Sequence, residues 1–250
     1  MPQNNKEYQA RPDLLKERVI LITGAGDGIG AVAARACAAH GATVILLGRT
    51  IRKLENVYDA IEKAGHPQPA IYPMNLEGAA PKDYLELAAT IDKEFGRLDG
   101  ILHNAAYLGS LTPLGQYKID IWSSVMQTNL NAPFLMTQAS FDLLKRSPDA
   151  SVLFTTSTVG RKGRAYWGGY GVSNAAVENM MQIWADETET NTAIRFNSID
   201  PGAVRTALRA KAYPAEDPNL LPLPEAVMGT YLYLLGPDSK GVTGQQWNAQ

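Results

Sequence analysis

Short apolar runs alternate with longer helical patterns along most of the chain. The apolar runs are continuous and are bounded by polar or glycine residues, which is typical of strands buried on both faces. The predicted strands cover residues 18–23, 43–47, 70–74, 98–102, 151–156, 193–199 and 246–248. The helical patterns between them cover residues 29–40, 52–64, 81–95, 119–145, 170–188 and 224–235. Strands that alternate with helices predict a doubly wound parallel sheet with helices on both faces, a Rossmann-type α/β fold.

Glycine and proline residues mark the ends of several elements. Gly41 and Gly65 follow helical patterns at positions where a C-cap glycine belongs. Pro133 falls inside the 119–145 pattern, so we expect a bend or a local irregularity in that helix. The stretch 201–224 is rich in proline and is predicted to form a loop.

Length and charge limit the class of protein. The chain has 250 residues, of which 45% are hydrophobic and 19% are charged, and its formal net charge is −2. This length suits a single domain, residues 1–250, that begins with a polar extension at 1–17. A net charge near zero gives no basic field for a phosphate backbone, so a nucleic acid is not an expected partner.

The chain carries no pattern of a membrane or secreted protein. No apolar run approaches the roughly 20 residues of a membrane helix, and the polar start lacks the apolar centre of a secretion signal. The single cysteine, Cys37, excludes an internal disulfide and suits a reducing compartment, so we expect a cytoplasmic protein. Cys37 and His40 can share one helix face, but two ligands are too few for a structural zinc, and no metal site is expected.

A glycine-rich segment joins the first predicted strand to the first predicted helix. It reads Thr-Gly-Ala-Gly-Asp-Gly-Ile-Gly over residues 23–30. Gly24 permits a tight turn, Gly28 lets the backbone approach a pyrophosphate, and Gly30 lets helix and strand pack closely. The helix N-terminus supplies amide donors and partial positive charge. This position favours a bound dinucleotide over a glycine-rich turn without a ligand.

The Gly-xxx-Gly-x-Gly spacing resembles that of the short-chain dehydrogenase/reductase family, which implies an NAD(P)-dependent oxidoreductase. A methyltransferase usually has an acidic residue at the end of the second strand, where this chain has Gly48 and Arg49. NAD enzymes also need an acidic residue there, whereas Arg49 can pair with a 2′-phosphate unless it is a solvated loop arginine. Asp27 opposes this interpretation, because many NADP-dependent members carry Lys or Arg at that position. We expect NADP(H), with NAD as the alternative.

The resemblance extends over nearly the whole chain, and blocks such as LDGILHNAAYLG and VLFTTSTVGRKGRAYWGGY resemble the bacterial YciK-like oxidoreductases. Asn75 and Leu76 stand where an Asp-hydrophobic pair contacts the adenine in the family. Thr206 stands where a side chain bonds the carboxamide or a phosphate. The resemblance implies a cofactor site made of Gly24, Asp27, Gly28, Ile29, Gly30, Arg49, Asn75, Leu76, Asn104, Ala105, Ala106, Tyr170, Asn174, Pro201, Gly202, Val204 and Thr206.

The resemblance also implies a catalytic group, in which the family uses Asn, Ser, Tyr and Lys. Tyr170 would exchange a proton with the substrate oxygen, Ser157 would hydrogen-bond that oxygen, and Asn129 would support a water on the proton path. Asn174 stands where the family has the lysine that binds the nicotinamide ribose and lowers the tyrosine pKa. Asparagine keeps hydrogen-bonding capacity without charge, so we expect cofactor binding with impaired turnover.

Three further segments have candidate roles, each with a plainer alternative. Lys162 is the best substitute cation if its loop folds inward, although basic loop residues are usually solvated. Residues 203–224 resemble a substrate lid, and a surface loop is the alternative. Met180, Met181 and Trp184 exceed what one core face requires, which together with the resemblance suggests a homodimer or homotetramer.

Two functions are open at this stage. The first is an NADP(H)-preferring oxidoreductase that interconverts a small-molecule alcohol and a carbonyl, impaired by the asparagine at position 174. The second is a cofactor-binding, largely non-catalytic sensor or assembly protein on the same fold. The two differ in turnover and share cofactor binding.

Overall fold

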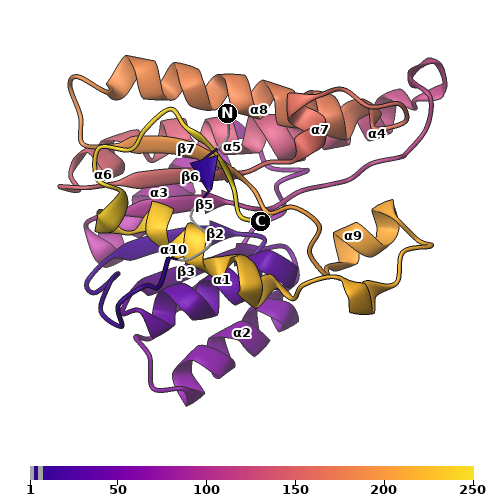
Figure 1. Ribbon diagram of the computed structural model, residues 1–250. Coiled ribbons are helices and arrows are strands. Elements are labelled where there is room, and N and C mark those ends of the chain that lie inside the picture. Colours follow the sequence, from indigo (N-terminus) through magenta and orange to yellow (C-terminus); the bar gives the residue numbers. More distant parts are fainter. Residues whose placement is uncertain (1–2, 5–7) are drawn as a thin grey trace.

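The protein, in a computed structural model that describes residues 3–4 and 8–250, is built around one parallel sheet with helices on both faces (Figure 1). The sheet order is β1-β8-β7-β6-β5-β2-β3-β4, and every neighbouring pair is parallel. The predicted Rossmann-type fold is confirmed. The strands are β1 (Gln3–Asn4), β2 (Val19–Thr23), β3 (Thr43–Gly48), β4 (Ala70–Pro73), β5 (Gly100–His103), β6 (Ser151–Thr155), β7 (Arg195–Asp200) and β8 (Gln246–Asn248).

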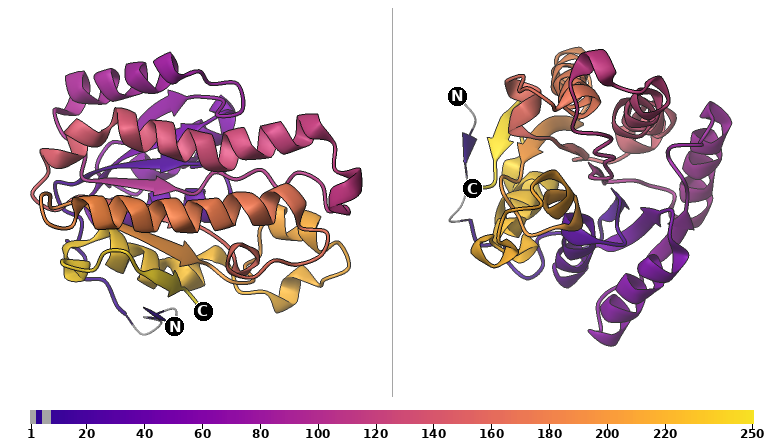
Figure 2. Two further views of the ribbon diagram at one scale, coloured as in Figure 1. Left: turned by 90° about the horizontal axis from the view of Figure 1, so that it is seen from above. Right: turned by 90° about the vertical axis from the view of Figure 1, so that its right-hand side faces the viewer.

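Successive strand residues point to opposite faces and so build two hydrophobic cores. Ile20 and Ile22 of β2 pack with one helical layer, and Leu21 between them packs with the other. Figure 2 shows these two layers on either side of the sheet. The first layer contains α1 (Gly28–Ala39), α2 (Ile51–Lys63) and α10 (Met228–Leu235), and the second contains α3 (Pro81–Phe95), α4 (Ile119–Met126), α5 (Ala132–Ala139), α6 (Phe141–Lys145) and α8 (Gly168–Thr188). None of the described helices is long and apolar enough to cross a bilayer.

The long helix predicted over 119–145 is interrupted, as Pro133 suggested. It divides into α4, a π-helical turn at Gln127–Asn131, α5 and α6. The wider turn directly precedes Ala132 and Pro133, where the proline ring cannot fit an unbroken helical backbone. Residues 201–224, predicted to be a loop, contain the short helix α9 (Ala207–Ala212), which lies beyond the carboxyl ends of the strands (Figure 1).

The apolar stripe predicted on α8 is arranged differently from our expectation. Met181 is fully buried, and Met180 and Trp184 are partly buried against the core. The Trp184 ring lies 5.4 Å from the Phe141 ring and 5.5 Å from the Phe196 ring, centroid to centroid. All three side chains therefore belong to the core, where aromatic rings pack on Trp184.

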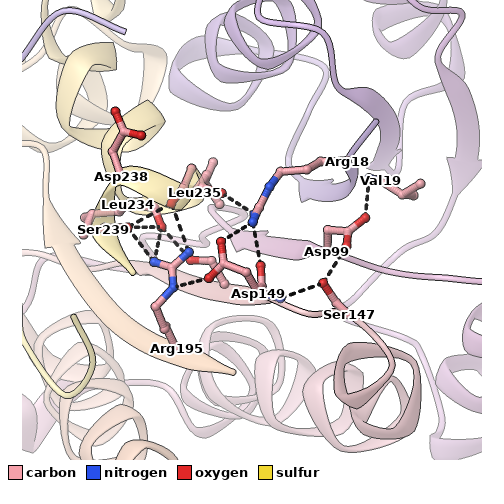
Figure 3. Close-up of polar contacts among 12 residues, drawn as sticks. Arg18, Val19, Asp99, Ser147, Asp149, Arg195, Leu234, Leu235, Asp238 and Ser239 are labelled. Atoms are coloured by element: carbon pink, nitrogen blue, oxygen red, sulfur yellow. Dashed lines mark hydrogen bonds and ion pairs between the residues drawn. The ribbon is translucent and has the colours of Figure 1, made fainter. Parts of the chain in front are cut away.

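A buried charge network closes the amino-terminal end of the sheet (Figure 3). Arg195 of β7 is 4% exposed, and its guanidinium donates to Asp149 Oδ1 at 3.0 Å and to Ser239 Oγ at 2.5 Å. It also donates to the carbonyl oxygens of Leu234 and Gly236, both at 3.0 Å. Arg18, directly before β2, donates to the same carboxylate of Asp149. One poorly exposed carboxylate thus joins two guanidinium groups, and Arg195 connects the sheet to the end of α10.

Asn at position 149 is expected to destabilise the fold strongly. Asp149→Asn leaves two poorly exposed guanidinium groups without a counter-charge, and we expect a loss of about 3 kcal/mol in the free energy of unfolding. Urea denaturation followed by circular dichroism measures this loss. The control is Arg146→Met, which removes a half-exposed pair with Asp92 and should cost less than about 1 kcal/mol. Equal losses in the two variants would contradict the proposed importance of the network.

Candidate active site

The glycine-rich segment between β2 and α1 is tightly packed against the neighbouring strand end. Gly24 has a φ of +67°, and a Cβ on it would lie 3.0 Å from Ala105 Cα. A Cβ on Gly30 would lie 2.3 Å from the carbonyl oxygen of Gly24 and 2.7 Å from Asn104 Nδ2. Only glycine fits at position 30, because backbone atoms fill the space. The turn and the close helix packing predicted for Gly24 and Gly30 agree with this geometry.

The side chain of Asp27 caps helix α1. Its Oδ1 accepts a hydrogen bond from Gly28 N at 2.8 Å, and Ile29 follows in the first turn. Gly28 has a φ of +51° and lies against Thr206, whose Cγ2 would be 3.4 Å from a Cβ on the glycine. Thr206 itself caps α9 by accepting from Arg209 N at 3.1 Å. The glycine loop and the start of α9 therefore meet at the carboxyl edge of the sheet.

Thr23, the last residue of β2, connects this loop to the end of β5. Its hydroxyl accepts hydrogen bonds from the backbone N–H groups of Asn104 and Ala105, both at 3.0 Å. Ala106 follows and lines a cavity with Ala105. These contacts fix the backbone after β5 beside the start of α1.

The other predicted cofactor residues lie at the ends of neighbouring strands. Asn75 is exposed and Leu76 is buried, just after β4, whereas Arg49 is exposed, just after β3. Beyond β7 come Pro201, Gly202 and the buried Val204. Because carboxyl ends of parallel strands share one edge, the fold brings all the predicted groups to the same side of the sheet.

The π-helical turn presents Asn129 to helix α8. Asn129 is 8% exposed, and its Oδ1 accepts from Tyr107 N at 2.8 Å. Its Nδ2 donates to Tyr107 O at 3.0 Å and to Ser173 Oγ at 3.1 Å. The amide of Asn129 therefore links α8 to the segment that follows β5.

Tyr170 and Asn174 lie one turn apart on α8, and both are buried, with 8% and 7% exposure. Nδ2 of Asn174 donates to the carbonyl oxygen of Tyr170 at 2.8 Å. The short helix α7 (Thr158–Arg161) packs on this turn so closely that a Cβ on Gly160 would lie 2.6 Å from Asn174 Cβ. Ser157 is the residue directly before α7. This packing brings the ends of β6 and β5 to the same turn of α8.

Burial, with a smaller contribution from the negative charge of Asp200, raises the pKa of Tyr170 to about 12, although a hydrogen bond from Asn174 opposes the change. Asp200 ends β7, and its carboxylate accepts from Thr158 Oγ1 at 2.6 Å and from Gly202 N at 2.9 Å. The sequence analysis did not single out Asp200. Its position directly before the Pro201–Gly202 pair was the available signal.

Of the two alternatives for Lys162, the structure agrees with the solvated one: Lys162 is exposed, and Arg161 takes the inward position. Arg161 Nε donates to Glu178 Oε1 at 3.0 Å, and its other nitrogens donate to Asn248 Oδ1 at 2.6 Å and Trp247 O at 3.0 Å. Glu178 also accepts from the hydroxyl of Thr156 at 2.7 Å. Arg161 is thus committed to a buried carboxylate, and the sequence analysis missed Glu178, which lies one turn beyond Asn174.

A cavity of about 20 Å³ lies beside these residues. Asn129, Asn174 and His103 contribute to its lining. Burial lowers the pKa of His103 to about 3, so its ring is neutral. Its Nε2 lies 2.9 Å from Thr137 Oγ1, and its Nδ1 has no hydrogen-bond partner among the described residues. This volume is sufficient for one water molecule with polar partners.

Comparison with known proteins identifies the family. The model of the short chain dehydrogenase family matches residues 18–217. The chain belongs to the short-chain dehydrogenase family. It is 46% identical to the uncharacterized oxidoreductase YciK of Escherichia coli K12, over 97% of this chain and 96% of that protein. The predicted resemblance to YciK-like proteins is thereby confirmed.

Solved structures of similar short-chain dehydrogenases share the fold over almost the full length. One from Pseudomonas syringae is 57% identical, with a TM-score of 0.94 over 98% of this chain and 99% of that chain. One from Shigella flexneri 2a, complexed with NADP, is 46% identical, with a TM-score of 0.93 over 96% of this chain and 100% of that chain. The chain is therefore a short-chain dehydrogenase-type oxidoreductase by family.

A lysine at position 174 should ionise Tyr170 at lower pH. The Tyr170 pKa of about 12, above the ordinary value of about 10, means that the folded chain favours the neutral phenol. The stability that this group contributes is therefore present below about pH 10 and is lost as the pH rises toward 12. In Asn174→Lys the ammonium favours the phenolate and lowers that pKa. Ultraviolet difference titration detects the tyrosinate. Subtracting the titration of the Tyr170→Phe variant, made with and without Asn174→Lys, isolates the signal of residue 170. Identical residue-170 signals in both backgrounds would contradict this prediction.

Proposed function

We propose that this chain is an NADP(H)-preferring oxidoreductase that interconverts an alcohol and a carbonyl on a small molecule. The observation that carries this proposal is the meeting of Tyr170, Asn129 and the α7 turn at the edge that also holds the glycine loop. The NADP complex of the Shigella flexneri relative supports the choice of cofactor. We also propose that the protein is cytoplasmic, since Cys37 is a free cysteine. The family resemblance supports a homodimer or a homotetramer.

The residues of the glycine loop fit a dinucleotide. Without side chains, Gly24 and Gly30 let the loop pack closely on the end of β5, which holds the N-terminus of α1 and its N–H groups at the carboxyl edge of the sheet. We assign Arg49 to the 2′-phosphate and Asn75 with Leu76 to the adenine. We assign the nicotinamide end to Asn104, Ala105, Ala106, Tyr170, Asn174, Pro201, Gly202, Val204 and Thr206, and the pyrophosphate end to Gly24, Asp27, Gly28, Ile29 and Gly30.

The cofactor, when bound, supplies the hydride for carbonyl reduction or accepts it from an alcohol. The Tyr170 hydroxyl donates a proton to the carbonyl oxygen during reduction. The Ser157 hydroxyl, which does not cap α7, donates a hydrogen bond to the same oxygen and orients it. Asn129 and Asn174 offer amide groups to a water in the adjoining cavity, through which Tyr170 regains its proton.

Charge in this site favours proton donation over proton abstraction. Asn174 brings no positive charge, Arg161 is paired with Glu178, and Asp200 adds a negative charge near Tyr170. A neutral phenol serves carbonyl reduction, but alcohol oxidation requires the phenolate. Turnover is consequently slow, and the reductive direction suffers less than the oxidative one.

Residues 203–224 form the proposed lid over the substrate. This segment contains α9 and the exposed side chains of Leu220 (82%) and Leu223 (51%). Arg209 pairs with Glu216 within it at 2.6 Å and stacks over the Tyr213 ring. Internal contacts of this kind let the segment move as one unit when a substrate binds.

A second function, a cofactor-binding sensor or assembly protein with little catalysis, is favoured by one observation. The Asn174 amide is engaged with the backbone of Tyr170 in its own helix. Binding of a dinucleotide needs no charge at that position, whereas proton transfer does. The same substitution experiment separates the two functions.

Restoring lysine at position 174 should raise activity. We expect Asn174→Lys to reduce members of a carbonyl panel at least about 100-fold faster than the unsubstituted chain, because a positive charge restores acid–base catalysis. Loss of NADPH absorbance measures the rate. The matched control is Val172→Lys, which places the same charge on the exposed face of α8. NADPH binding without turnover in either chain would favour the sensor, and equal turnover would show another proton path.

A further inference from the structure

The first turn of α2 packs directly on the glycine loop. Ala25 N donates to Leu47 O at 3.1 Å, which joins the loop to the end of β3. A Cβ on Gly26 would lie 2.9 Å from Lys53 Cβ, so the lysine stem covers the loop backbone. Lys53 Nζ then reaches Asp27 Oδ2 at 2.5 Å. A half-exposed lysine is thus held at the loop by packing and by an ion pair.

Asp27 brings a negative charge to the place where phosphates are expected. Its carboxylate caps Gly28 N, and the hydrogen bond from Lys53 is the main cause that lowers its pKa, so it is ionised at neutral pH. A bare carboxylate there would repel a phosphorylated ligand. Lys53 cancels that charge, so Asp27 does not offset the positive charge of Arg49, two residues after Leu47.

From this charge balance we propose that Lys53 determines the preference for a 2′-phosphorylated dinucleotide by neutralising Asp27 beside Arg49. This inference rests on the proposed NADP(H) function and names a residue of that site. Without Lys53, the unpaired charge of Asp27 opposes that of Arg49, and the attraction for an additional phosphate is weaker. A dinucleotide without the 2′-phosphate depends much less on this balance. Lys53 is therefore a specificity-determining residue that acts partly through Asp27.

The test is a charge cycle measured by binding. NADPH and NADH are titrated by fluorescence into the unsubstituted chain, Lys53→Met, Asp27→Asn and the double variant. We expect Lys53→Met to weaken NADPH binding by about 10-fold or more, the effect of one charge-assisted contact, and NADH binding by less than about threefold. The double variant regains most of the NADPH affinity, because it no longer carries an unpaired carboxylate beside Arg49. Lys53→Arg keeps the preference.

Lys63→Met is the matched control, since Lys63 is an exposed lysine in the last turn of the same helix. Unchanged NADPH affinity in Lys53→Met, or equal losses for both cofactors, would overturn the proposal for Lys53. A double variant no better than Lys53→Met would overturn the role of Asp27. If the unsubstituted chain binds neither NADPH nor NADH, the proposed function itself fails, which is a distinct result. Circular dichroism of each variant verifies that the fold is intact.

Discussion

The buried carboxylate of Glu178 is the interaction on which the arrangement of the candidate site depends. It accepts hydrogen bonds from Thr156 after β6, from Ser198 in β7 and from Arg161 in α7. A carboxylate with 4% exposure is costly to bury unless its oxygens are fully engaged. Since each partner belongs to a different element, satisfying this charge fixes α7 and α8 relative to two central strands.

This constraint explains how the candidate site is held together. Ser157 directly precedes α7, and Tyr170 and Asn174 lie on α8, one or two turns before Glu178. Packing of Gly160 on Asn174 brings the two helices so close that a side chain has no space between them. The same pairing occupies Arg161, so the inward cation of this loop stabilises the scaffold through Glu178.

Local sequence patterns predicted most of the fold and the outline of the site. The strands follow from continuous apolar runs, and the glycine loop from its position between strand and helix. Local patterns could not decide which of the basic residues 161–164 lies inward, because that depends on Glu178, 17 residues away. The burial of Trp184 also could not be predicted locally, because its ring packs on Phe141 and Phe196 from other elements. Pairings between distant segments depend on the completed fold.

The two ends of the proposed dinucleotide site differ in how their charges are balanced. At the loop end, many NADP-dependent members carry Lys or Arg at the position of Asp27. Here Lys53, on a neighbouring helix, pairs with Asp27 and compensates for its negative charge. At the Tyr170 end, the positive charge absent from position 174 has no such replacement, and Asp200 makes the balance more negative. Binding depends on the first balance and proton transfer on the second. Under the proposed function, a chain with this distribution of charge selects a cofactor while its chemistry slows, which makes affinity for the cofactor and turnover separable properties.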